Sequence, residues 1–143
     1  MASTTETELL AQARTELIAR CDVIEETYEF MLAYAGQGLA SDAGSSKGTQ
    51  VREYLTKAES ALGALVTFAA GFAKHDTEGL APYTAFMNVI GSDAAAARAA
   101  VALVQVQESI SSQVIDNLNA SIHLRALLTD LFLIDEILKA HRG

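Results

Sequence analysis

The C-terminal segment SIHLRALLTDLFLIDEILKAHRG, residues 121–143, decides the fold because ten of its twenty-three residues are Leu, Ile or Phe. On a helical wheel at 100° per residue these side chains do not form a single stripe. One broad apolar face consists of Leu124, Leu127, Leu128, Leu131, Ile134 and Leu138. A second face, roughly opposite, consists of Ile122, Ala126, Leu133, Ile137 and Ala140.

A helix that is apolar on two sides needs protein on both of them. The core of the chain's own fold supplies one side. For the other, we expect a second copy of the chain, because most soluble oligomers are symmetric and two-fold dimers are the commonest. The second face is therefore the predicted homodimer interface. The alternative is that a short helix over residues 82–90, rich in Tyr83, Phe86, Met87 and Ile90, covers this face within one chain.

One charge falls on the main apolar face of this last helix. Asp135 projects among leucines, where an unpaired carboxylate costs several kcal/mol. Its expected partner is Arg14, which interrupts the apolar stripe of the first helix. In an up-down bundle the first and last helices are antiparallel, and the two residues then lie level. We predict a buried Arg14–Asp135 ion pair, with a buried binding site as the functional interpretation of the same pair.

Two further helices follow from spacing. The first begins near Ser3 or Thr5, where SxxE and TxxE fit a capping box, and alternates steps of 4 and 3 from Leu10 to Ala35. Residues 36–48, GQGLASDAGSSKG, indicate a mobile loop. A second helix begins near Thr49 and repeats the same alternation from Val51 to Phe72. Gly63 and Gly71 in this helix allow close approach of a neighbouring helix.

Pro82 then opens a short helix that Gly91 closes. Residues 92–142 contain no Gly and no Pro, so they form either one helix of about 50 residues or two helices with a bend. Ser, Asn and Asp concentrated in residues 109–121 favour a bend near residues 116–120. The prediction is a single all-α domain, residues 1–143: an up-down four-helix bundle with a short extra helix between its second and third helices. A three-helix arrangement with one C-terminal helix of about 50 residues is the alternative.

Charge and composition exclude several classes of partner. The net charge is −8, with 18 acidic and 10 basic residues, and such a surface repels nucleic acid. No membrane span and no secretory leader are expected. The single cysteine, Cys21, cannot form an internal disulfide, which agrees with a cytoplasmic location.

The chain carries no spacing that commits it to catalysis. A di-iron bundle needs Glu-x-x-His motifs, and no Glu has a His three positions later. His75, His123 and His141 lack a second ligand at i±4, so we expect no metal and no cofactor. Cys21 lies on an apolar stripe, which favours an inert thiol. GSSKG, residues 44–48, matches the hydrolase elbow in spelling only, because no strand precedes it.

Excess apolar helix surface without catalytic spacing predicts a non-catalytic protein–protein interaction, as an adaptor or regulatory homodimer. A heterologous protein partner is also open. The alternative from a different class is a ligand-binding or catalytic bundle. In that case a small apolar molecule or cofactor lies between helices near Tyr28, Phe68, Phe72 and Tyr83.

Overall fold

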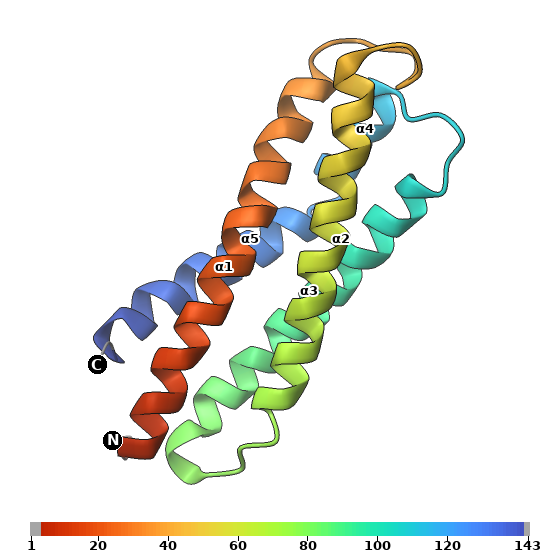
Figure 1. Ribbon diagram of the computed structural model, residues 1–143. Helices are drawn as coiled ribbons and strands as arrows, with labels where there is room; N and C mark the ends of the chain where they lie inside the picture. The colour runs from red at the N-terminus through yellow and green to blue at the C-terminus, as the bar shows by residue number, and fades with distance from the viewer. Residues whose placement is uncertain (1–3, 142–143) are drawn as a thin grey trace.

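The computed structural model describes residues 4–141, and every regular element in that range is helical (Figure 1). Five α-helices are present within it, one more than the four predicted long helices. Their bounds are α1 Thr4–Ala35, α2 Ser46–Phe72, α3 Ala81–Gln105, α4 Ser112–Ala120 and α5 His123–Leu138. Two short 3₁₀ helices, η1 Glu78–Leu80 and η2 Lys139–His141, precede α3 and follow α5. The all-α prediction is confirmed.

The helices enclose one hydrophobic core, to which all five contribute. α2 packs between α1 and α3, whereas α5 packs against α1 and α3, and α4 packs mainly against α1 (Figure 1). In α2 the predicted stripe is buried along its whole length. In α1 only alternate members of the predicted stripe, Leu10, Leu17, Ile24 and Met31, are buried.

The prediction of a short helix ending at Gly91 is wrong. Pro82 does occupy the first turn of a helix, but that helix continues through Gly91 to Gln105. Gly91 is needed for packing: a Cβ built on it would lie 3.1 Å from Cβ of Ala69 in α2. The glycine therefore lets two helices approach each other closely, which a sequence pattern does not distinguish from a helix end.

The continuous C-terminal helix is also wrong, and the predicted bend is displaced. The chain leaves helical geometry over residues 106–111 and again at residues 121–122, while residues 116–120 belong to α4. Ser111 caps α4 by accepting a hydrogen bond from the backbone N–H of Val114. Ile122 adopts a left-handed φ of 67°, which turns the chain into α5 without a glycine. Polar cap formers and one strained residue make these breaks in place of Gly and Pro.

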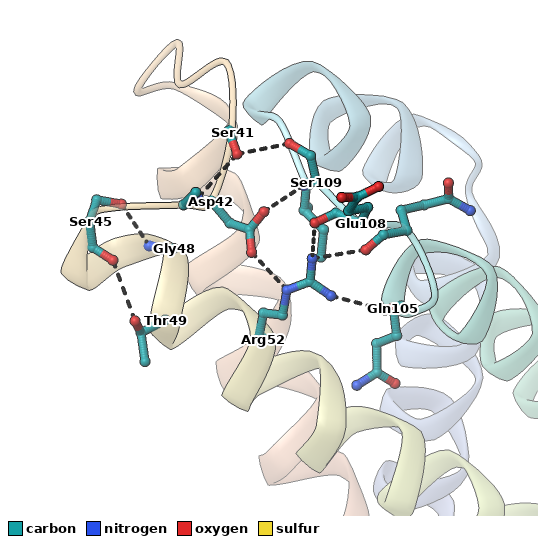
Figure 2. Close-up of polar contacts among 12 residues, drawn as sticks. Ser41, Asp42, Ser45, Gly48, Thr49, Arg52, Gln105, Glu108 and Ser109 are labelled. Atoms are coloured by element: carbon teal, nitrogen blue, oxygen red, sulfur yellow. Dashed lines mark hydrogen bonds and ion pairs between the residues drawn. The ribbon is translucent and has the colours of Figure 1, made fainter.

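The loop between α1 and α2 is tied to the loop between α3 and α4 by a polar latch, defined here as Asp42 and Arg52 with their backbone partners (Figure 2). Arg52 Nε donates to Asp42 Oδ2 at 2.7 Å, and Asp42 Oδ1 accepts from the Ile110 N–H at 2.7 Å. The remaining Arg52 nitrogens donate to the carbonyls of Gln105, Gln107 and Glu108. Arg52 therefore satisfies carbonyls at the C-terminus of α3 that have no partner in the helix.

Further hydrogen bonds strengthen the same end of the molecule. Tyr34 donates to the carbonyl of Ile110 at 2.7 Å, and Ser112 Oγ donates to the carbonyl of Tyr34 at 2.6 Å. The backbone of Leu39 pairs with Ser112 in both directions. The predicted loop over residues 36–48 is irregular only through residue 45, because α2 begins at Ser46 and not near Thr49. The prediction of a mobile loop did not include these anchors.

By length and composition, the helical stretch Glu78–Gln105 qualifies as a candidate membrane span, although none was expected from the sequence. A core helix of a globular protein meets the same criterion. This stretch packs against α2 on one side and α5 on the other, and 33% of its apolar window is buried.

Candidate functional site

The second apolar face of α5 is not covered by the chain's own helices. Leu133 and Ile137 are 52% and 45% exposed, and Ala126 is half-buried. Ala140 is exposed too, but it lies in η2, after the end of α5. Ile122 is 54% exposed but lies in the turn before α5, outside the helix that was expected to carry it. The left-handed turn therefore shortens the predicted face by one residue.

The beginning of α3 reaches this face and forms an apolar groove with it. The groove has a volume of about 320 Å³ and is lined by Pro82, Tyr83, Phe86, Leu133, Ile134 and Ile137. We call it the α3–α5 groove. The alternative in which residues 82–90 cover the face is thus met only in part, because Leu133 and Ile137 keep about half of their surface exposed.

Two polar contacts mark the ends of this groove. At one end, Tyr83 Oη lies 3.3 Å from His141 Nε2. At the other end, the carboxyl groups of Asp93 in α3 and Asp130 in α5 face each other. Each helix contributes three residues spaced i, i+3, i+7 on one side. On α3 these are Phe86, Val89 and Asp93, and on α5 they are Asp130, Leu133 and Ile137. Because Phe86 is level with Leu133 and Ile137 while Asp93 is level with Asp130, the two helices run antiparallel.

The Asp93–Asp130 pair is electrostatically unfavourable when both groups are ionised. Two carboxylates are acceptors only, and Asp130 Oδ2 is buried with no hydrogen-bond partner among residues 4–141. Burial, followed by the facing carboxyl group of Asp93, raises the pKa of Asp130 to about 7. A proton on Asp130 supplies the one O–H donor that lets the two carboxyl groups bond.

The two residues of the predicted ion pair lie together. Arg14 Nε is 2.8 Å from Asp135 Oδ1, between α1 and α5. Their side chains are 21% and 32% exposed, so the pair is half-buried and not fully buried as expected. It borders a hollow of about 200 Å³ that Leu17, Cys21 and Leu131 also line. That volume is below the range of about 300–1,000 Å³ typical of small-molecule sites.

Cys21 is held in its neutral thiol form. Burial, together with the charges of Glu25, Asp22 and Asp135, raises its pKa to about 11. The thiolate is the nucleophilic form of cysteine and is scarce at neutral pH for such a group. The sequence prediction of an inert thiol agrees with this environment.

The four residues of the predicted ligand pocket do not meet. Phe68 and Phe72 line a hollow between α1 and α2 with Leu9 and His75. Tyr83 lines the α3–α5 groove, and Tyr28 packs against the core without lining either hollow. Spacing places each aromatic on an apolar side of its helix, but it does not say which neighbouring helix that side meets.

Within residues 4–141, no three His, Cys, Asp or Glu side chains are grouped closely enough to hold a metal ion. Sequence reasoning also missed the Asp93–Asp130 pair. The predicted end of the short helix at Gly91 places Asp93 in a separate helix, out of line with Phe86 and Val89. A continuous α3 would have placed Asp93 on the same side as Phe86 and Val89, which is the signal that could have found it.

Comparisons of the chain with protein-family models, with curated proteins and with solved structures find no match.

Proposed function

We propose that this chain is a non-catalytic interaction protein that docks another polypeptide along the outer side of α5 and the start of α3. The observation that carries the proposal is the exposure of Leu133 and Ile137 beside the α3–α5 groove. Val89, 43% exposed, extends the same apolar surface along α3. We call this surface the docking face; it comprises Tyr83, Phe86, Val89, Ala126, Leu133, Ile137 and Ala140.

The energetic scale supports docking at this face. Full burial of a Leu, Ile or Val side chain is worth about 1.5–3 kcal/mol, so covering three half-exposed ones contributes about 2–4 kcal/mol. Contiguous apolar surface of this kind marks interaction sites in soluble proteins more often than isolated exposed leucines do. The groove supplies a concave seat for an incoming side chain, as the centre of a specific interface requires.

For the purified chain we propose a homodimer, because each copy presents the same docking face and a two-fold axis covers both at once. We further propose that the fold is an up-down four-helix bundle in which α4 and α5 together take the place of the fourth helix. We also propose a cytoplasmic location, because a free cysteine in its thiol form agrees with a reducing compartment.

The test is the mass of the purified chain in solution, measured by analytical ultracentrifugation across a wide concentration range. We expect a dimer that Leu133→Asp dissociates. Leu103→Asp is the matched control, because Leu103 is 65% exposed on α3 outside the docking face and should leave the mass unchanged. A wild-type chain that stays monomeric at every concentration would contradict the homodimer.

A further inference from the structure

We propose that the docking face accepts an amphipathic helix of another protein, whose apolar side fills the α3–α5 groove and whose Lys or Arg reaches the Asp93–Asp130 pair. This inference rests on the proposed function and names the class of partner. It follows from the way apolar and acidic groups are ordered along one surface.

The docking face has the shape that a helix needs. From Tyr83 to Asp93 the exposed side of α3 rises about 15 Å, or nearly three helical turns. The antiparallel α5 provides the other wall with Ile137 and Leu133, and the buried Ile134 forms the floor. A helix laid in such a groove presents apolar anchors at i, i+3 or i+4, and i+7.

The acidic end of the groove selects the charge of the partner. Asp93 and Asp130 lie one turn beyond Val89 and Leu133, at the point where an anchor row of three residues would end. Asp130 Oδ2 is buried and has no donor. Both residues are otherwise partly exposed, so an ammonium or guanidinium group beside the pair supplies N–H donors to carboxyl oxygens that repel one another when ionised.

No basic side chain of the chain itself takes this position. The one cationic group near Asp93 on α3 is Arg98, and its guanidinium lies over Gly63 of α2, 3.1 Å from where a Cβ would be. On α5, His123 and Arg125 are exposed seven and five residues before Asp130. His141 contacts Tyr83 at the far end of the groove. No ion pair joins either aspartate to a basic residue within residues 4–141.

Charge makes a basic partner the stronger competitor for a face that a second copy covers in the purified chain. Each chain carries −8, so a homodimer forms against a net repulsion, whereas a cationic helix is attracted and oriented from a distance. A second copy would also bring another pair of carboxyl groups to the interface. The described basic residues near its face are Arg125, beside Ala126, Lys139, which bonds to Glu136, and His141.

The experiment uses the full chain and two synthetic helical peptides of about 18 residues, five turns. Both carry the same leucine row; one has Lys at each end of that row and the other has Glu. Binding is measured by fluorescence anisotropy of the labelled peptide. We expect the Lys peptide to bind at least about tenfold more tightly, because a fully desolvated like-charge contact penalises the Glu peptide.

Isosteric variants identify the groups responsible. The double variant Asp93→Asn, Asp130→Asn should remove the preference for Lys, with its helix content checked by circular dichroism. Asp116→Asn, an exposed aspartate on α4, is the control for a lost charge elsewhere. A lysine held by the ionised pair also displaces its proton. Lys-peptide affinity should therefore fall about 30-fold from pH 8.5 to pH 5.5, in both His123→Gln and His141→Gln backgrounds.

Three outcomes would overturn the inference. Equal binding of both peptides would show that the face docks helices regardless of charge. Binding of neither peptide by a chain that dimerises, with Leu133→Asp abolishing the dimer, would identify a second copy as the occupant and leave the proposed function standing. Binding of neither peptide by a monomeric chain would remove the inference and the proposed function together.

Discussion

Arg14 Nε and Asp135 Oδ1 lie 2.8 Å apart and join the first and last α-helices across 121 residues of sequence. Each charged group interrupts an apolar side of its own helix, and each is half-buried at the contact. The pair therefore fixes the height of α5 relative to α1. It leaves Asp135 next to Cys21, whose pKa it helps to raise.

We expect this pair to contribute more to stability than an ordinary surface ion pair. A double-mutant cycle with Arg14→Gln and Asp135→Asn should give a coupling energy of about 1 kcal/mol, at the upper end for solvent-accessible pairs. Urea unfolding measures it. Lys139 and Glu136 provide the control, since Glu136 is 73% exposed and their coupling should be close to zero. Equal coupling in the two pairs would show that α1 and α5 do not depend on this contact.

The polar latch should be more sensitive than either ion pair. Asp42→Ala leaves Arg52 and the Ile110 N–H without their shared acceptor, and we expect a loss of about 2–3 kcal/mol in the free energy of unfolding. Ser41→Ala removes two exposed hydroxyl contacts, with Ser109 and with the Ala43 N–H, and should cost less than about 0.5 kcal/mol because water replaces both.

The same carboxyl group gives a pH signature. The Arg52 hydrogen bond holds the pKa of Asp42 below its ordinary value. Its stabilisation is thus present above the ordinary carboxyl range and is lost as pH falls through the lowered value. The stability difference between wild type and Asp42→Asn should shrink in acid unfolding experiments below about pH 4. A difference that stays constant to pH 2 would separate the latch from this ionisation.

The helices themselves could be predicted from spacing, since the α2 stripe is buried as its periodicity indicated. The residues at which the helices end could not be predicted from the sequence. Glycine is a common residue at a helix end, but Gly91 lies inside α3, where it allows close packing against Ala69. Ile122 adopts a left-handed conformation, which a β-branched side chain disfavours. Single-residue conformations of this kind are set by tertiary contacts.

A contact between two helices could be predicted only where a charged residue on an apolar face required a partner of opposite charge. Asp135 needed a cation, and Arg14 was the sole charge on the α1 stripe. The Asp93–Asp130 pair is unfavourable by itself, so no complementarity rule points from one residue to the other. Its position depends on the register of α3 against α5, which follows from the displaced break at residues 121–122.

Two glycines of α2 should respond in opposite directions to alanine. A Cβ on Gly48 would lie 1.7 Å from the carbonyl oxygen of Asp42, so Gly48→Ala must displace the loop backbone. We expect a loss of more than about 3 kcal/mol. Gly71 has nothing within 4 Å of the corresponding position, although the sequence predicted close helix packing there. Gly71→Ala should gain about 0.5–1 kcal/mol from helix propensity. Thermal unfolding of the two variants tests both signs, and a stabilising Gly48→Ala would contradict the tight passage of the loop over α2.

Stability should fall as pH rises through neutrality, because of Asp130. Its pKa rises from an ordinary value of 3.8 to about 7 in the folded chain, so the folded state binds a proton that the unfolded state has already released between those values. The stabilisation from that proton is complete below the unfolded pKa and is lost as pH rises through the folded pKa.

The variant Asp130→Asn cannot ionise and keeps an N–H donor for Asp93. It should therefore match wild type near pH 4 and exceed it at pH 8 by about 1 kcal/mol, a value reduced for the partial exposure of the side chain. Urea unfolding at pH 4, 6 and 8 measures the crossover, with Asp116→Asn as the exposed control. A wild-type chain whose stability relative to Asp130→Asn does not change over this range would show that Asp93 and Asp130 are both ionised, and the proton assigned to the end of the groove would be absent.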